Sequence, residues 1–94
     1  MPEYLVLGNW TDQGLKKVKD APDRIKETHR TTEALGGKMT LYYTLGDYDF
    51  IMIFSMPDDK AMIKVLTFLG SKGNARTKTL AAYSEEEGEN LIKE

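Results

Sequence analysis

The sequence predicts a single α+β domain in which two helices cover one face of a four-stranded antiparallel sheet. Its 94 residues are the length of one domain. Short apolar segments alternate with longer segments whose apolar residues recur every three or four positions, a pattern typical of strands and helices. Two of the short segments, residues 4–10 and 50–54, are apolar at both odd and even positions. They therefore predict central strands that are covered on both faces.

The first predicted strand, residues 4–10, leads into a helix that Thr11 caps. One face of this helix carries residues at steps of three and four: Leu15, Val18, Pro22, Ile25, His29 and Thr32. Because proline lacks a backbone N–H and restricts the residue before it, the helix must either kink or restart at Pro22. The stripe keeps its phase across Pro22, which favours a kink, and Gly36-Gly37 ends the helix.

A β-hairpin is predicted next, between residues 38 and 54. Residues 38–45 alternate an apolar face with a polar and aromatic face, which is typical of an edge strand. Gly46-Asp47 predicts a tight turn between this strand and the next. Residues 50–54 are the most hydrophobic segment of the chain, and we expect them to form the centre of the sheet.

The second half of the chain predicts a second long helix followed by a fourth strand. Asp58 or Asp59 is expected to cap a helix that ends in residues 70–74 and buries one stripe: Ala61, Met62, Val65, Leu66 and Leu69. Residues 76–83 predict a second edge strand, because two cations share one of its faces. Residues 84–87 read as a capping box that opens a short tail helix, so residues 1–94 form one domain with residues 84–94 as its tail.

The order of these elements is β-α-β-β-α-β, which is the order of the ferredoxin-like fold. Right-handed crossovers then place the first and third strands in the centre of the sheet, in the strand order 4-1-3-2. The two strands that are apolar on both faces are the same two strands, so the burial pattern and the topology agree.

This fold leaves one face of the sheet without helices. That face carries one of two apolar sets: Leu5, Leu7, Ile51 and Ile53, or Val6, Phe50, Met52 and Phe54. Monomers rarely expose a patch of this kind. We therefore expect a homodimer or larger homo-oligomer in which two copies pack sheet to sheet about a two-fold axis. Leu91 and Ile92 of the tail helix offer too little apolar surface to cover the face instead.

Composition excludes several classes of function. The net charge of −2 argues against a nucleic-acid partner, for which a basic patch is the usual footprint. The chain has no cysteine, which removes disulfides, thiolate chemistry and cysteine metal sites. It has one histidine, so a zinc site would need carboxylates for nearly all of its ligands. We expect no metal and no cofactor. The first residues lack the pattern of a signal peptide, and no apolar run is long enough to cross a membrane. These features favour a cytoplasmic protein without a membrane partner.

Three segments of the chain resemble the GYD domain family. They are residues 4–14, the motif Gly46-Asp47-Tyr48-Asp49, and residues 69–77. The resemblance extends to about Glu87 and implies a dimeric α/β-barrel protein, whose ferredoxin-like subunits pair through their sheets. It implies no particular activity. The same motif, followed by an apolar strand, also resembles the effector-binding domain of Lrp/AsnC regulators, in which the corresponding turn lies near an amino-acid site between subunits. Without a helix-turn-helix, this second resemblance implies a stand-alone ligand-binding module.

His29 and Asp49 are the candidate catalytic residues. An imidazole can transfer protons near neutral pH, and His29 lies on the apolar stripe of the first helix. Asp49 shares a strand face with Ile51 and Ile53, where a carboxylate needs a partner. Both residues also have structural interpretations: a histidine at the edge of the stripe, and an aspartate that accepts backbone N–H bonds or pairs with Arg76.

The candidate ligand-binding residues are aromatic or charged: Trp10, Tyr43, Asp47, Tyr48 and Arg76. The aromatic residues, with Tyr42, are expected to line a pocket or to serve in packing. Asp47 and Asp49 would lie at a subunit boundary in a regulator-like module. Residues 70–77 combine glycines, hydroxyls and cations, which suit either an anion cradle or a helix C-cap.

Two functions follow from these observations. The first is a homo-oligomeric module that binds a small molecule, or only assembles, without catalysis. The alternative is a cofactor-free enzyme of the dimeric α/β-barrel kind, an oxygenase or isomerase, that uses His29 and Asp49. The enzyme requires these two residues to face an enclosed cavity.

Overall fold

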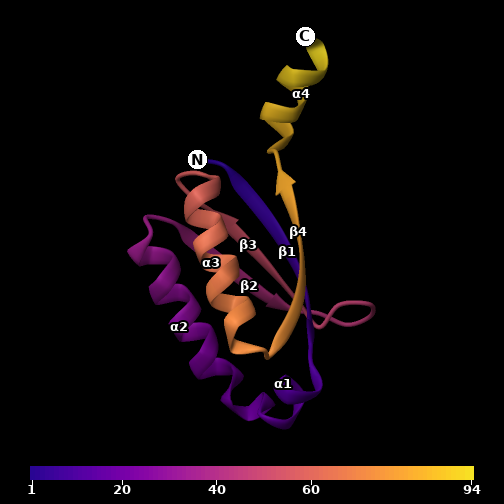
Figure 1. Ribbon diagram of the computed structural model, residues 1–94. Coiled ribbons are helices and arrows are strands. Elements are labelled where there is room, and N and C mark those ends of the chain that lie inside the picture. The colour runs from indigo at the N-terminus through magenta and orange to yellow at the C-terminus, as the bar shows by residue number, and fades with distance from the viewer.

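The computed structural model describes all 94 residues and contains one four-stranded sheet with helices (Figure 1). The elements in order are β1 (Glu3–Trp10), α1 (Asp12–Lys16), the 3₁₀ turn η1 (Val18–Asp20), α2 (Ala21–Ala34), β2 (Lys38–Tyr43), β3 (Phe50–Ser55), α3 (Asp59–Lys72), β4 (Ala75–Ala82) and α4 (Glu85–Lys93). The strand order is β2-β3-β1-β4 and all three pairings are antiparallel. The predicted ferredoxin-like fold, with strand order 4-1-3-2, is confirmed.

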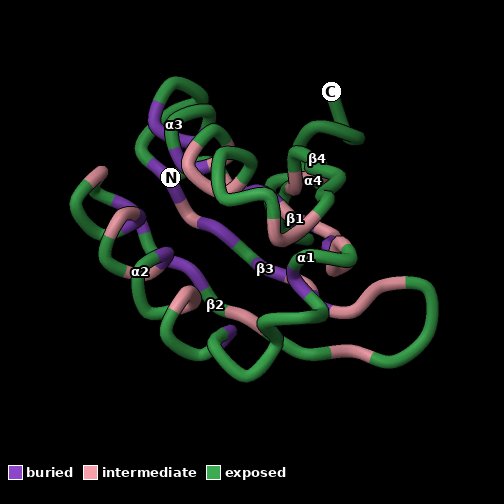
Figure 2. Tube along the Cα trace, turned by 60° about the horizontal axis from the view of Figure 1, so that its bottom comes forward, coloured by how far each residue is buried: buried purple, intermediate pink, exposed green.

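The core lies between the sheet and the two long helices. Figure 1 shows α2 and α3 side by side over the same face of the sheet. The buried cluster comes from β1, β2, β3, α3 and the segment that joins β3 to α3: Tyr4, Val6, Met39, Phe50, Met52, Phe54, Met56, Ala61, Met62 and Val65. Of the two apolar sets on the central strands, the one that contains Val6, Met52 and Phe54 therefore faces the helices. In Figure 2 the buried residues gather on the central strands and on the turns of the helices that face them.

The first helical segment restarts instead of bending, so the favoured kink at Pro22 is wrong. α1 ends at Lys16, η1 follows, and α2 begins at Ala21 with Pro22 in its first turn. A proline fits there because the first N–H groups of a helix have no intrahelical partner. The restart changes the rotation of the helix, so Leu15 and Val18 are exposed.

The buried side of α2 includes two threonines, Thr28 and Thr32. The hydroxyl of Thr28 donates to the carbonyl of Arg24 at 3.1 Å, and that of Thr32 donates to the carbonyl of Thr28 at 2.7 Å. Bonds to the preceding turn let a hydroxyl be buried without losing its hydrogen bond. A threonine can therefore occupy a core position on this helix.

The predicted hairpin between β2 and β3 is confirmed, but the tight turn is wrong. Residues 44–49 form a loop that extends away from the sheet (Figure 1). The loop is closed by Thr44, whose N–H donates to the Asp49 carbonyl at 3.0 Å and whose hydroxyl donates to the Tyr48 carbonyl at 2.6 Å. These bonds end the strand pairing early. Leu45, which we expected on the apolar face of the strand, is fully exposed in the loop.

The predicted caps of the last two helices are confirmed. The Asp58 side chain accepts a hydrogen bond from the N–H of Ala61 at 2.8 Å, and Gly73 ends α3 in the left-handed conformation with φ of 70°. The Ser84 hydroxyl accepts from the N–H of Glu87 at 3.1 Å. α4 continues beyond the end of β4, away from the sheet, and buries none of its residues (Figure 1). No helix combines the length and the hydropathy that a membrane span requires.

Candidate functional site

The open face is the side of the sheet opposite the helices, and its centre is apolar. The pairing of the strands places Leu5 between Ile53 and Leu80, and Leu7 beside Ile51. Ile53 is 40% exposed and Leu80 is 50% exposed, although both lie within the sheet. Tyr42 extends this patch onto β2, beside Ile51. The open face is therefore defined by Leu5, Leu7, Tyr42, Ile51, Ile53 and Leu80.

Charged side chains border the open face. Lys78 pairs with Leu7, and Arg76 pairs with Asn9, so both cations lie along β4 on this side of the sheet. Glu3 pairs with Ser55 and lies at the opposite end of the strands. An apolar centre with a charged border is the usual composition of an interface that forms in water.

A groove of about 590 Å³ lies where the end of β1 meets the start of β4. It is lined by Leu7, Asn9, Trp10, Thr11, Asp12, Tyr48, Arg76, Thr77 and Lys78. Three of the five predicted ligand-binding residues, Trp10, Tyr48 and Arg76, therefore come together. Two cations, one carboxylate (Asp12), two aromatic rings and several hydrogen-bonding groups suit a small polar ligand that carries an anionic group.

Asp49 holds the hairpin loop against the end of β1. Its Oδ2 accepts a hydrogen bond from the backbone N–H of Trp10 at 2.9 Å, and its own N–H donates to the carbonyl of Gly8 at 2.9 Å. The ring of Trp10 packs on Phe50 with 4.8 Å between centroids. These contacts correspond to the structural interpretation of Asp49, in which the carboxylate accepts a backbone hydrogen bond.

The remaining predicted site residues lie elsewhere. His29 is half-buried on α2, Tyr43 is exposed at the end of β2, and Asp47 is exposed in the hairpin loop. None of these three residues lines any of the three cavities of the molecule, and neither does Asp49. The two candidate catalytic residues are thus not brought together in one cavity. Residues 70–77 form the C-cap of α3 and the start of β4.

Sequence reasoning missed two polar features of the structure. The Tyr4 hydroxyl donates to the carboxylate of Asp59, and this hydrogen bond, with burial, raises the pKa of Tyr4 to about 12. Arg24 and Lys72 line a cavity between the helices and the sheet. No local pattern indicates either feature, because the groups that meet are far apart in sequence or resemble ordinary surface charges.

Comparisons with known proteins agree with this architecture. Residues 4–92 match the GYD domain. The chain is 33% identical over 84 residues to the glutamine synthetase and cystathionine beta-lyase binding protein of Thermus thermophilus, with 87% of this chain and 88% of that protein covered. The crystal structure of TTHA0845, also from Thermus thermophilus, has the same fold, with a TM-score of 0.56 and 22% identity over 89% of this chain and 95% of that one. The chain therefore belongs to the GYD domain family.

Proposed function

We propose that this protein is a non-catalytic binding module that works as a homodimer, paired through its open face, and that docks on a metabolic enzyme. The observation that carries the proposal is the uncovered apolar centre of the sheet. Leu5, Ile53 and Leu80 lie side by side there, and α4 extends away from them (Figure 1). An apolar patch of this kind on a small domain usually marks a protein interface.

A second copy of the chain fits this face because sheets pack well on one another. Two sheets pack about 10 Å apart with their strands within roughly 30° of alignment, so the side chains of two apolar faces can interdigitate. When the two-fold axis runs along the strands, β4 of one subunit crosses β2 of the other. Lys78 then lies opposite the partner's Tyr42, where an ammonium group over an aromatic ring is attractive.

The protein partner is inferred from the family. A relative that is 33% identical is named for binding glutamine synthetase and cystathionine beta-lyase. We extend this role to the present chain and propose that its partner is an enzyme of one of these two kinds. The alternative of a cofactor-free oxygenase or isomerase requires His29 and Asp49 to share a cavity. Neither residue lines one, so the binding role is preferred.

Small-molecule binding is a second candidate function, favoured by the groove of Trp10, Tyr48 and Arg76. The cations Arg76 and Lys78 lie on the open face, so in the proposed dimer the groove lies at the border of the interface. A small anion bound there would be held at the subunit boundary. Replacement of Arg76 by glutamine would weaken such binding, and isothermal calorimetry with candidate anions would measure the loss.

The test of the dimer is the solution mass over a dilution series, by sedimentation velocity. We expect twice the 10.7 kDa mass of the chain down to low micromolar concentration. Ile53→Asp places a charge at the centre of the open face and should give monomers. The control is Ile63→Asp, because Ile63 is exposed on the outer side of α3. A monomeric wild-type protein, or equal masses for both variants, would refute the pairing.

The enzyme partner is tested by immobilising this protein on a surface and measuring the binding of glutamine synthetase and cystathionine beta-lyase from the same source organism. We expect saturable binding of one of the two enzymes to the wild-type protein. The absence of saturable binding to both enzymes, with a protein that is dimeric, would refute the partner and leave the dimer intact.

A further inference from the structure

We infer that Glu3 and Lys38 form ion pairs across the two-fold axis of the proposed homodimer, and that these pairs set the register and the selectivity of self-association. The inference rests on the proposed pairing of two copies through the open face. It adds the direction of the two-fold axis and the charged residues by which one copy recognises another. Three observations support it: the positions of the two charges, their lack of partners within the chain, and the spacing of facing strands.

Glu3 and Lys38 lie at the same end of the sheet and on its open face. Glu3 pairs with Ser55 in the ladder between β1 and β3, and Lys38 pairs with the same Ser55 in the ladder between β2 and β3. The three residues therefore form one row across the sheet. Side chains alternate between the two faces of a strand, and the neighbours Tyr4 and Met39 are buried in the core on the helical side. Glu3 and Lys38 consequently point to the open face.

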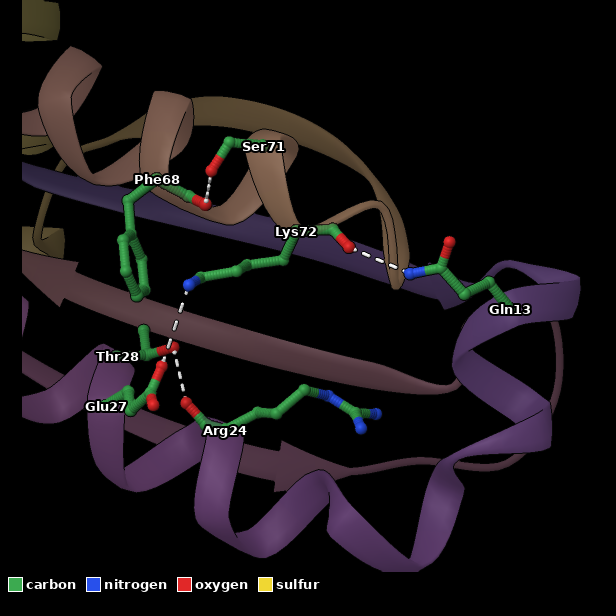
Figure 3. Close-up of polar contacts among 7 residues, drawn as sticks. All are labelled: Gln13, Arg24, Glu27, Thr28, Phe68, Ser71 and Lys72. Carbon is green, nitrogen blue, oxygen red and sulfur yellow. Dashed lines mark hydrogen bonds and ion pairs between the residues drawn. The ribbon is translucent and has the colours of Figure 1, made fainter.

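Neither of these charges has an ion-pair partner in its own chain. The only ion pair within the chain joins Lys72 of α3 to Glu27 of α2, on the helical side of the sheet, with 3.9 Å between Nζ and Oε2 (Figure 3). Lys38 is exposed and Glu3 is half-buried, so a second sheet on this face would take both charges partly out of water. Removal of a charge from water is costly unless an opposite charge meets it. A well-matched partner should therefore offer each charge its opposite.

A two-fold axis along the strands supplies these opposite charges by symmetry. Rotation about that axis leaves the height of each residue along the strands unchanged and exchanges the two edges of the sheet. Because the strand order is β2-β3-β1-β4, β1 then faces the partner's β3, and β4 faces the partner's β2. Glu3 faces the partner's Ser55, and the partner's Lys38 lies on the next strand in the same row.

The spacing of the strands allows the contact. Facing sheets are about 10 Å apart and neighbouring strands about 4.8 Å apart, so the Cα atoms of Glu3 and the partner's Lys38 would be roughly 11 Å apart. The extended side chains of a glutamate and a lysine together span this distance. A rotation of roughly 30° between the sheets moves the two residues relative to one another by about one strand spacing, which these long side chains can follow. The pair occurs twice, because the axis relates the two copies.

A two-fold axis across the strands would leave both charges without an opposite charge. It places β1 over the partner's β1 and reverses the height along the strands, so Glu3 would face the partner's Asn9 at the other end of β1. Lys38 would likewise face the far end of the partner's β2, which ends in two tyrosines and carries no charge. Charge complementarity therefore favours the axis along the strands, in which Lys78 also lies opposite the partner's Tyr42.

Charge exchange tests the pairs. Glu3→Lys and Lys38→Glu each replace two attractive contacts in the homodimer by two repulsive ones. We expect either variant to raise the dissociation constant of the dimer about tenfold, measured by sedimentation velocity over a dilution series. An equimolar mixture of the two variants should form a heterodimer, with both contacts attractive again, at concentrations where each variant alone is monomeric. The variant that carries both exchanges should dimerise within about threefold of the wild type.

The matched controls are Glu33→Lys on α2 and Lys64→Glu on α3, which make the same changes of charge at exposed positions on the helical side of the molecule. Their dissociation constants should equal that of the wild type. The effect of Glu3→Lys should also shrink in about 1 M sodium chloride, because salt screens interactions between charges. A loss of packing at Glu3 would not respond to salt in this way.

An experiment on the wild-type protein covers the case in which a variant fails to fold, as judged by circular dichroism. A carbodiimide joins a carboxylate to an amine in direct contact, with loss of water. In a mixture of ¹⁴N- and ¹⁵N-labelled protein, mass spectrometry distinguishes links between subunits from links within one chain. We expect a linked peptide that joins Glu3 of one copy to Lys38 of the other.

The outcomes separate this inference from the proposed dimer. Three results, each with a wild-type protein that is dimeric, would overturn the ion pairs and leave the dimer intact. They are dissociation constants unchanged by both exchanges, a mixture of the two variants that stays monomeric, and the absence of a mixed-isotope link between Glu3 and Lys38. A monomeric wild-type protein would overturn the dimer and the ion pairs together.

Discussion

Gly14 and Gly70 are both helical glycines, yet the structure predicts opposite effects when each is replaced by alanine. A Cβ atom at Gly14 would lie 2.0 Å from the backbone carbonyl oxygen of Asn74. To reach an ordinary contact of 3.4 Å, the loop between α3 and β4 would have to move by roughly 1.4 Å. A Cβ atom at Gly70 would have no atom within 4 Å.

The cost at Gly14 follows from the hydrogen bonds that hold this loop. Thr11 donates its N–H to the Asn74 carbonyl at 3.1 Å and its hydroxyl to the Gly73 carbonyl at 2.7 Å. Gln13 Nε2 donates to the carbonyl of Lys72 and to the side-chain oxygen of Asn74, both at 2.9 Å. A shift of roughly 1.4 Å weakens all four bonds, each of which contributes about 0.5–1.5 kcal/mol. The higher helix propensity of alanine offsets only about 1 kcal/mol of this loss of stability.

We therefore expect Gly14→Ala to lower the free energy of unfolding by about 2 kcal/mol, and Gly70→Ala to raise it by about 0.5–1 kcal/mol. Urea denaturation followed by circular dichroism measures both changes, at one fixed protein concentration because self-association contributes to stability. If Gly14→Ala is as stable as Gly70→Ala, the close packing of α1 on this loop is refuted.

Two further predictions concern Tyr4 and Asp49. The pKa of Tyr4 is raised from 10.0 to about 12, so the folded protein holds this proton more tightly than the unfolded chain. The stability that this bond between the protonated Tyr4 and Asp59 contributes should be complete below pH 10 and should disappear as the pH rises to about 12. Phenolate absorbance should show one late-titrating tyrosine that Asp59→Asn shifts to lower pH, and an unchanged titration would contradict the Tyr4–Asp59 bond. Asp49→Ala leaves the N–H of Trp10 without its acceptor and should cost about 1–3 kcal/mol in chemical denaturation, whereas Asp49→Asn keeps an oxygen there and should cost less. Equal losses for both Asp49 variants would show that the charge of Asp49, and not the bond, is what matters.

The fold was predictable because its signals are local and repeated. Val6, Met52 and Phe54 lie in strands that are apolar on both faces, and this alone identified the central strands. The capping residues Asp58 and Ser84 marked two helix starts by their own hydrogen bonds. Each of these features depends on a few neighbouring residues, so the sequence contains the whole signal.

The two wrong predictions, the kink at Pro22 and the tight turn at Gly46-Asp47, concern places where the local sequence pattern fits more than one structure. Helical spacing around Pro22 is the same for a kink and for a restart, since a short 3₁₀ turn changes the rotation without changing the pattern of residue types. In the hairpin, Gly46-Asp47 is a strong signal for a two-residue turn. The bonds of Thr44 to Tyr48 and Asp49 close a longer loop instead.

The candidate site was predictable only in part. Trp10 is the last residue of β1, Arg76 lies at the start of β4, and Tyr48 lies just before β3. These strand ends meet at the same end of the sheet, so topology brings the three residues together. Arg24 could not be identified, because an arginine on an amphipathic helix is normally a solvated charge. The position of its guanidinium depends on the bond of Nη1 to the Lys17 carbonyl and on the ring of Trp10, and that is a property of the tertiary structure.

Trp10 connects the hairpin loop to the groove at the border of the open face. Its backbone N–H donates to Asp49 of the hairpin loop, its ring packs against Phe50, and it lines the groove. A small anion in the groove would therefore lie against a residue that both the loop and the core hold in place, at the boundary between the proposed subunits. Any change that the anion makes in the affinity between subunits must equal the change that pairing makes in anion affinity. Titrations with such an anion above and below the dissociation concentration of the dimer would thus measure the coupling free energy, and equal affinities would show that the groove and the pairing are independent.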